Sequence, residues 1–305
     1  MRPRNQAITS IDRQTPPKAP RPRAKKSLGQ NFLADGRVVS RILHAAEISA
    51  DDLVLEVGPG RGVLTRKLAE RAGGVVAVEL DDALADSLKS EFEDSPNVSI
   101  MHADAREADI DDLVPAGMPY KLVANLPYYA ASPIIRRFLE ADHKPKLMVV
   151  MVQREVARSM CAEPGKMSIL SVATQLYGSP RVVMSVPPRA FRPSPKVTSA
   201  VVRIDVYDSP CLEFDSEERF FDLVRAGFSA PRKQVHNCLQ KGLDISKEQA
   251  EGLLEAASVD PRRRPQTLSL NEWGGLYRAY CLKYGHDERT AIADSEGIRQ
   301  NKPHA

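Results

Sequence analysis

Short apolar runs alternate with amphipathic stretches along most of the chain, from Ser27 to about Asp208. Five aliphatic or β-branched runs have the composition and length of strands: Leu53–Val57, Val75–Glu79, Val98–Met101, Leu122–Ala124 and Leu147–Val152. Apolar residues recur at helical spacing over four further stretches: Val38–Glu47, Val63–Arg71, Ala83–Phe92 and Pro133–Leu139. Continuous apolar strands joined by helices predict an α/β fold with a mostly parallel sheet, covered on both faces.

Local signals add detail to this pattern. Ser132 is a candidate N-cap, and Pro133 is then suited to the first position of the helix that follows. Val182–Val186 and Ala200–Ile204 predict two further strands, which we expect at one edge of the sheet. A Pro-rich loop, residues 187–199, joins them.

The pattern changes after Asp208, where four segments have helical periodicity and a capping box is formed by Ser269 and Glu272. The segments are Ser216–Phe228, Pro231–Lys241, Lys247–Ala257 and Ser269–Lys283. We expect residues 27–208 to form one domain and residues 209–285 a small all-helical domain. Residues 1–26, rich in Pro and Arg, predict a disordered basic tail, and residues 286–305 a polar tail.

Composition excludes several classes of protein. The chain has 305 residues, of which 42% are hydrophobic, enough for a sizeable core. No apolar run approaches the ~18 residues of a membrane span, and the first residues lack a secretory signal. The four cysteines contain no C-x-x-C and the six histidines no ligand spacing, which predicts reduced thiols and no metal site. We therefore expect a soluble cytoplasmic protein.

A glycine-rich turn, Gly58-Pro59-Gly60-Arg61-Gly62, follows the first of the five strands and precedes a helix. Such a turn lets the backbone approach a ligand closely, although its G-x-G-x-G spacing differs from the dinucleotide fingerprint. Glu79 ends the next strand, where an acid can accept both hydroxyls of an adenosine ribose. Asp104 follows the third strand and can hold an adenine amino group. Together these features predict a nucleoside-cofactor site.

The fourth strand is followed by Asn125-Leu126-Pro127-Tyr128-Tyr129. An adenine N6 amine is a poor nucleophile because its lone pair is delocalised into the ring. The Asn125 side-chain oxygen and the Pro127 carbonyl can accept its two hydrogens and draw the nitrogen towards tetrahedral geometry. Tyr128 offers a face for a flipped-out base, and such stacking is worth ~1–3 kcal/mol. We expect no strong general base, because the proton leaves after the nitrogen has become positively charged.

Four motifs in this chain resemble those of the KsgA-type ribosomal RNA adenine N6,N6-dimethyltransferases. They are G-Q-N-F-L at Gly29–Leu33, the glycine turn, N-L-P-Y-Y, and P-P-x-x-F-x-P-x-P-K-V at Pro187–Val197. The likeness covers residues 25–284, including R-R-P-Q-T-L-S-L at Arg263–Leu270. N-L-P-Y is shared with the erythromycin-resistance rRNA methyltransferases, whereas the Pro-rich loop and the C-terminal run favour the small-subunit enzyme.

This resemblance implies a Rossmann-like class I methyltransferase fold, S-adenosylmethionine as cofactor, and dimethylation of two adjacent adenines near the 3′ end of small-subunit (16S) rRNA. By matching motif positions, it implies cofactor contacts from Gln30, Asn31, Leu33, Gly58, Gly60, Glu79, Asp104 and Asn125. It also implies that Asn125, Leu126, Pro127 and Tyr128 form the catalytic motif, and that Phe191 clamps the target base together with Tyr128.

Local charge is consistent with an RNA partner. The net charge of +3 conceals a basic tail, because residues 1–26 hold eight Lys or Arg and one acid. Within the acidic remainder, residues 181–203 and 223–241 carry basic residues and no acid, and Arg262, Arg263 and Arg264 form a third cluster. We expect RNA contacts from Arg189, Arg192, Lys196, Arg225, Arg232 and Lys233.

Three alternatives accompany this interpretation. One is a large-subunit rRNA adenine methyltransferase of the erythromycin-resistance type. Another is a ribosome assembly factor with dispensable catalysis, although Glu79 and Asn125 are both retained. A nicotinamide oxidoreductase is disfavoured by the glycine spacing and by the lack of a hydride-handling His or Lys near the strand ends. We expect a monomer acting on rRNA within an immature ribosomal subunit.

Overall fold

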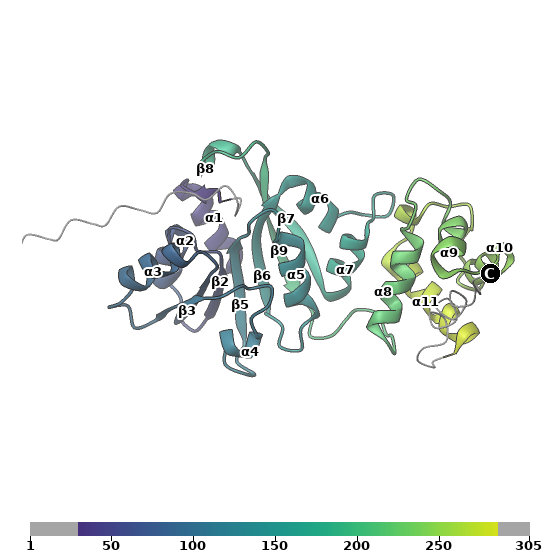
Figure 1. Ribbon diagram of the computed structural model, residues 1–305, viewed down its shortest axis with the longest axis horizontal. Helices are drawn as coiled ribbons and strands as arrows, with labels where there is room; N and C mark the ends of the chain where they lie inside the picture. The colour runs from purple at the N-terminus through teal and green to yellow at the C-terminus, as the bar shows by residue number, and fades with distance from the viewer. Residues whose placement is uncertain (1–29, 286–305) are drawn as a thin grey trace, which may run out of the picture.

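A computed structural model describes residues 30–285, so the expectations for residues 1–26, Gly29 and 286–305 lie outside the described part. The centre of the molecule is a seven-stranded sheet of order β4-β3-β2-β5-β6-β9-β7 (Figure 1). Its strands are β2 (Leu53–Val57), β3 (Gly74–Glu79), β4 (Val98–His102), β5 (Tyr120–Asn125), β6 (Leu147–Gln153), β7 (Gly178–Val186) and β9 (Ser199–Val206). Strands β2 to β6 are parallel, and β9 and β7 join antiparallel at one edge. The predicted strands, the α/β class and the added edge pair are confirmed.

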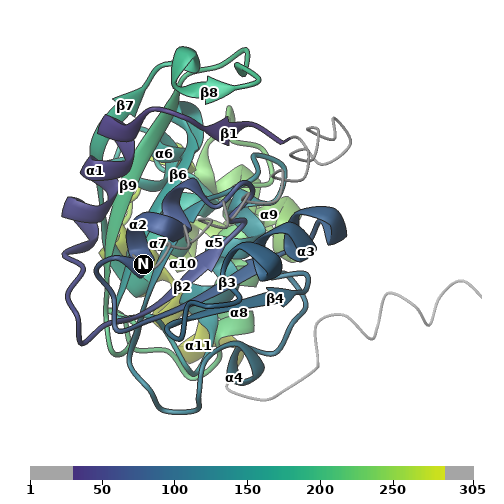
Figure 2. The same ribbon diagram turned by 90° about the vertical axis from the view of Figure 1, so that its left-hand side faces the viewer.

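Helices cover both faces of this sheet, as the continuous apolar strands predicted. They include α1 (Gly36–Ala46), α2 (Val63–Ala69), α3 (Asp82–Glu91) and α5 (Ala131–Glu140). On β5, Val123 packs into the apolar cluster that contains α1 and α2, whereas Leu122 and Ala124 pack into the cluster that contains α5. Figure 2 shows α1 alongside β9. Alternate residues of one strand therefore supply both cores.

The start of α5 corrects one expectation. The helix begins at Ala131 with Ala130 as N-cap and no side-chain cap, so Ser132 and Pro133 lie within its first turn. The reason is the preceding turn, in which the Ala130 N–H donates to the Pro127 carbonyl at 3.0 Å and leads the chain directly into the helix. Proline is tolerated there because N–H groups of the first turn have no partner within the helix.

Several short elements were not predicted. They are α4 (Ile110–Leu113), α6 (Arg154–Met160), α7 (Ile169–Tyr177) and a two-stranded sheet of β1 (Phe32–Leu33) and β8 (Phe191–Arg192). The last pairs residues that are far apart in the chain, with Phe32 opposite Arg192 and Leu33 opposite Phe191. The strands β1 and β8 and the helix α4 have too few residues to show a period. The helices α6 and α7 are at least as long as α2, which was predicted, so their length does not explain why they were missed.

The C-terminal region is helical, as expected, and its helices are α8 (Glu217–Gly227), α9 (Val235–Leu243), α10 (Lys247–Ala256) and α11 (Leu270–Tyr284). The Ser269–Glu272 capping box is present at the start of α11. Helix α9 begins at Val235 rather than Pro231, and the Val235 N–H, which has no partner within the helix, donates to the Arg263 carbonyl at 2.7 Å. One apolar cluster continues from the sheet into these helices, so a domain boundary near residue 208 stays a prediction.

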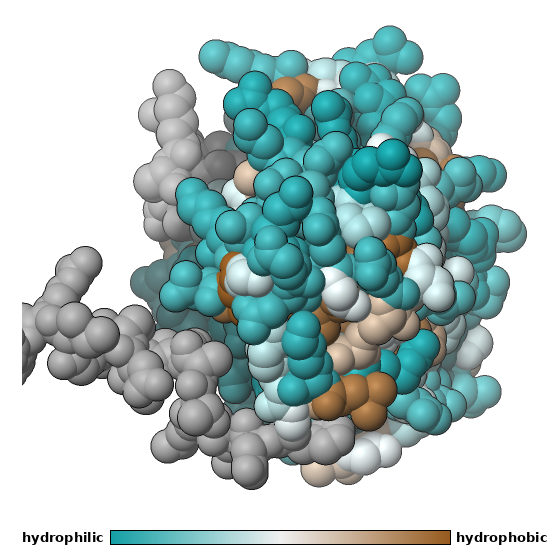
Figure 3. Space-filling model, turned by 90° about the vertical axis from the view of Figure 1, so that its right-hand side faces the viewer, coloured by the Kyte–Doolittle hydropathy of each residue, from teal (hydrophilic) through white to brown (hydrophobic). Residues whose placement is uncertain are grey.

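The face formed by the C-terminal helices is mostly hydrophilic, with small separate apolar patches (Figure 3). Within residues 30–285, no helix combines the length and apolar character that crossing a bilayer requires.

Candidate active site

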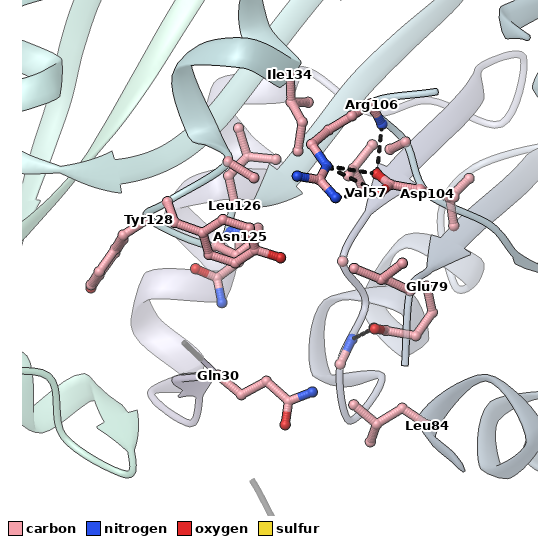
Figure 4. Close-up of a pocket in the computed structure, with 18 of the residues that line it drawn as sticks. Gln30, Val57, Glu79, Leu84, Asp104, Arg106, Asn125, Leu126, Tyr128 and Ile134 are labelled. Carbon is pink, nitrogen blue, oxygen red and sulfur yellow. Dashed lines mark hydrogen bonds and ion pairs between the residues drawn. The ribbon is translucent and has the colours of Figure 1, made fainter. Parts of the chain in front are cut away.

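A pocket lies at the carboxyl ends of β2, β3, β4 and β5, and its empty volume is about 800 Å³ including the part open to solvent. The chain runs outward from β2 to β3 and β4 and then returns to β5 on the other side of β2. Ligands of open α/β sheets bind at such a reversal, because the loops on either side leave a crevice. Figure 4 shows Asn125 and Tyr128 on one side of it, Glu79 on the other, and Asp104 with Arg106 at one end.

The glycine turn forms the floor between β2 and the pocket. Gly58 and Gly60 have φ values of 72° and 59°, a region in which residues with a Cβ are strained. A Cβ on Gly60 would also come within 2.9 Å of the Phe32 ring. Both positions therefore require glycine, and the bare backbone is open to a ligand.

Glu79 is held rigidly at the end of β3. Its carboxylate accepts the Gly60 N–H and the Asp81 N–H, each at 2.9 Å, one on each oxygen. Burial raises the pKa of Glu79, against the lowering effect of these backbone bonds. Each oxygen keeps a further lone pair, so the side chain can still accept two hydroxyl groups.

Asp104 is also in the pocket wall, but it already has a strong partner. The Arg106 guanidinium contacts both of its oxygens, with Nη2 to Oδ2 at 2.5 Å and Nε to Oδ1 at 3.0 Å. This hydrogen-bonded pair holds the pKa of Asp104 below its ordinary value. Sequence reasoning missed Arg106, whose only local signal is its position two residues after the acid.

Asn125 ends β5, and its side-chain amide is oriented by the segment before β1. Its Nδ2 donates to the Asn31 carbonyl at 3.3 Å, which leaves Oδ1 as an acceptor. The Pro127 carbonyl is less free than expected, because it already accepts the Ala130 N–H, although a carbonyl has a second lone pair. Leu126 lines the pocket from a buried position, 1% exposed.

Tyr128 is half-buried, and its hydroxyl lies 2.7 Å from the Ser199 Oγ at the start of β9. Burial raises the pKa of Tyr128, so the ring carries a neutral hydroxyl. The contact fixes the ring between the pocket and the edge strands.

The segment from Gln30 to Leu33 closes one side of the pocket. Gln30 donates to the Asp81 carboxylate at 3.0 Å, and Phe32 lies under the Arg61 guanidinium, 4.4 Å from Cζ to ring centroid. Gln30 and Asn31 line the pocket, whereas Leu33 does not: it is 5% exposed and packs into the cluster beneath α1.

Phe191 departs from the role that the resemblance implied. It is fully buried in the same cluster, paired through its backbone with Leu33, and it does not line the pocket. A base cannot stack on a ring that other side chains cover, so a clamp by Phe191 would require the β1–β8 ribbon to open.

The predicted RNA-contact residues lie outside the pocket lining. Arg189, Arg192 and Lys196 are exposed on the loop between β7 and β9, and Arg232 and Lys233 are exposed between α8 and α9. Arg225 is exposed too, and it pairs with Asp222 at 2.7 Å.

Part of the basic charge is neutralised within the fold. Arg203 pairs with Glu47 and Asp205, both at 2.6 Å. Asp205 lies two residues beyond the acid-free segment 181–203, whereas Glu47 comes from a distant part of the sequence. In the third cluster, Arg262 pairs with Asp260 and Arg263 with Glu272.

The chain is similar to known proteins over most of its length. The family model described as "Ribosomal RNA adenine dimethylase" matches residues 21–274. A relative from Dehalococcoides mccartyi, named ribosomal RNA small subunit methyltransferase A, is 47% identical over 86% of this chain and 89% of its own. A protein of the same name from Clostridium perfringens is 42% identical over 83% of this chain and 90% of its own.

Two solved structures resemble the whole fold. A dimethyladenosine transferase from Plasmodium falciparum has a TM-score of 0.72 at 26% identity, covering 83% of this chain and 98% of that one. The 23S rRNA methyltransferase ErmE has a TM-score of 0.65 at 32% identity, covering 82% of this chain and 99% of that one. By the extent of these matches, the chain belongs to the ribosomal RNA adenine dimethylase family of methyltransferases.

Proposed function

We propose that this protein dimethylates the N6 amines of two adjacent adenines near the 3′ end of small-subunit (16S) rRNA, with S-adenosylmethionine as methyl donor. The observation that carries the proposal is the position of Asn125, which lines a pocket shared with Gly58 and Glu79. The names of the relatives from Dehalococcoides mccartyi and Clostridium perfringens support the small subunit as the source of the substrate.

The residues of the pocket fit the cofactor. Glu79, immobilised by two backbone N–H groups, would hold the ribose, and Asp104 the adenine amine. Gly58 and Gly60 would lie beside the amino-acid portion, where a Cβ is excluded, and Gln30 and Asn31 would cover it. The bound cofactor supplies an electrophilic methyl group on a sulfonium, and the protein supplies alignment and exclusion of water.

Asn125 and Pro127 would bind the two hydrogens of the target amine through their oxygens. The bond from Asn125 Nδ2 to the Asn31 carbonyl keeps Oδ1 turned to the amine, which is the orientation an acceptor needs. The adenine would stack on Tyr128, whose hydroxyl is anchored to Ser199. The methylated nitrogen is positively charged and loses its proton without a strong base.

We infer that the exposed basic loops contact the rRNA, within an immature small subunit and with the protein as a cytoplasmic monomer. Arg189, Arg192 and Lys196 on one side and Arg232 and Lys233 on the other would bind phosphates. The domain limits at residues 27–208 and 209–285 belong to the same proposal, with the helical part as an RNA-binding domain.

A second candidate is methylation of large-subunit RNA, which the similarity to ErmE favours. The test supplies labelled S-adenosylmethionine with unmethylated small subunits and, separately, with unmethylated large-subunit RNA. Asn125→Ala is the inactive variant, and Asn271→Ala, exposed on α11, is the matched control. Labelled dimethyladenosine from the small subunit alone, lost only in Asn125→Ala, is the expected result.

Label in the large-subunit RNA would instead assign the protein to the second candidate. Absence of label in both, with the cofactor still bound, would reject catalysis and leave a ribosome assembly factor as the function.

A further inference from the structure

Two loops that face each other across the pocket are in contact through Arg106 and Tyr129. Arg106 follows β4 and Tyr129 follows β5, and the Arg106 Cζ lies 5.9 Å from the centroid of the Tyr129 ring. Both residues line the pocket, yet Tyr129 is 50% exposed and the Arg106 side chain is 40% exposed. They therefore form the outer rim of the pocket rather than its floor.

The Arg106 side of this rim is held in place by α5. The Arg137 guanidinium donates to three consecutive backbone carbonyls, at 3.1 Å to Arg106, 3.4 Å to Glu107 and 2.5 Å to Ala108. Arg106 itself is fixed at the other end by its two-point contact with Asp104. The loop after β5 leads directly into α5, so both sides of the rim are attached to one helix.

The neighbouring tyrosines have different partners. Tyr128 contacts Ser199 on β9, on the side of the edge strands, while Tyr129 contacts Arg106, on the side of β4. The loop after β5 thus provides one ring for the target base and a second ring at the Asp104 end of the pocket.

We propose that Arg106 and Tyr129 form a clamp over the adenine of the cofactor, with Arg106 positioning the Asp104 carboxylate and Tyr129 covering the purine. This inference rests on the proposed function, since it takes Asp104 as the adenine contact. A planar guanidinium and a phenol ring both stack well on a flat heterocycle such as adenine.

The test measures ligand binding by calorimetry on the full-length protein, with S-adenosylhomocysteine and with S-ribosylhomocysteine, which lacks the base. The variants are Arg106→Ala, Tyr129→Ala, their combination, and Tyr129→Phe, which keeps the ring. We expect each alanine variant to bind S-adenosylhomocysteine about three- to tenfold more weakly, in line with a stacking contact. In the double variant the affinity for S-adenosylhomocysteine should fall by a smaller factor than the product of the two single-variant factors. Tyr129→Phe should bind this ligand like the unchanged protein.

Binding of S-ribosylhomocysteine should be the same in all variants, because the clamp would contact only the base. Equal weakening for both ligands would overturn the clamp in favour of a general distortion of the pocket. Tighter binding of S-adenosylhomocysteine by Arg106→Ala would also overturn it, since Arg106 would then be a competitor for Asp104. Unchanged affinity in Tyr129→Ala combined with weaker RNA binding would assign Tyr129 to the rRNA instead.

If the unchanged protein did not bind S-adenosylhomocysteine, the proposed cofactor itself would be rejected. That result differs from failure of the clamp, in which the unchanged protein binds S-adenosylhomocysteine but the variants give one of the overturning results above. Arg41→Ala, exposed on α1 and outside the pocket lining, is the matched arginine control.

Discussion

The Asn125 side chain donates to the backbone carbonyl of Asn31, a residue 94 positions earlier in the chain. This bond connects the end of β5 to the segment that covers the pocket, and it determines which end of the Asn125 amide faces the ligand. The residue that would accept the target amine is therefore oriented by a backbone group and not by another side chain.

Replacing Asn125 should abolish transfer without abolishing cofactor binding. Asn125→Ala removes the acceptor at the reacting nitrogen, so we expect kcat to fall by about a hundredfold or more. Calorimetry with S-adenosylhomocysteine should show an affinity within about threefold of the unchanged protein. A large loss of affinity with normal kcat would mean that Asn125 serves the cofactor alone.

Changes at Tyr128 should alter the ratio of monomethyl to dimethyl product. After the first transfer the amine keeps one hydrogen, so it can no longer bond both Asn125 and Pro127, and the pocket must accept a rotated methyl group. Tyr128→Phe frees the ring from Ser199 and should raise the monomethyl fraction, measured by mass spectrometry of digested RNA. A ratio of monomethyl to dimethyl product equal to that of the unchanged protein, in both Tyr128→Phe and Tyr128→Ala, would contradict this prediction.

Gly60→Ala should destabilise the fold more than a comparable change elsewhere. A positive φ costs about 1–2 kcal/mol for a residue with a Cβ, and at Gly60 the new atom also meets the Phe32 ring at 2.9 Å. Gly117 has a similar φ of 72° with nothing within 4 Å, so Gly117→Ala measures the backbone cost alone. Urea unfolding should give a lower free energy of unfolding for Gly60→Ala than for Gly117→Ala. Equal losses of stability in the two variants would show that the Phe32 ring moves aside without cost.

Glu56 should make stability depend on pH. This residue of β2 is 1% exposed, and burial raises its pKa to about 8. Between the ordinary pKa of 4.5 and about 8, the folded protein holds a proton that the unfolded chain has lost, so stability falls as pH rises. Glu56→Gln has no such proton.

Thermal unfolding between pH 5 and pH 9 should therefore show the advantage of Glu56→Gln over the unchanged protein growing with pH and levelling above the pKa of about 8. Glu93→Gln, exposed on the surface, is the control and should follow the unchanged protein. Parallel profiles for Glu56→Gln and the control would show that Glu56 ionises in the fold without cost.

The loop between β7 and β9 should contribute salt-dependent RNA affinity. Arg189→Ala, Arg192→Ala and Lys196→Ala should each weaken binding and reduce the slope of log affinity against log salt by roughly 0.7–0.9 per lost phosphate contact. Arg203→Ala should instead lower the melting temperature with little change in that slope, because Arg203 pairs with Glu47 and Asp205. Unchanged slopes in all three loop variants would place the RNA elsewhere.

Local patterns were sufficient for the sheet and for most of the site. Five apolar runs identified β2 to β6. Gly58, Glu79, Asp104 and Asn125, which lie at or just after the ends of the first four strands, all line one pocket. This works because parallel strands place their carboxyl ends at the same edge, so a polar residue after each strand reaches a common crevice.

Only the tertiary structure shows which of these groups are already buried, hydrogen-bonded or paired with other residues of the protein. The Phe191 ring, which the resemblance assigned to the target base, is buried where β8 pairs with β1 at Leu33. The Pro127 carbonyl already accepts one hydrogen bond, from the Ala130 N–H. Arg203 meets Glu47 from 156 positions away, and Arg106 meets Tyr129 across the pocket. Such partners depend on the packing of distant segments, whereas the periodicity of a sequence reports only which side of its own element a residue occupies.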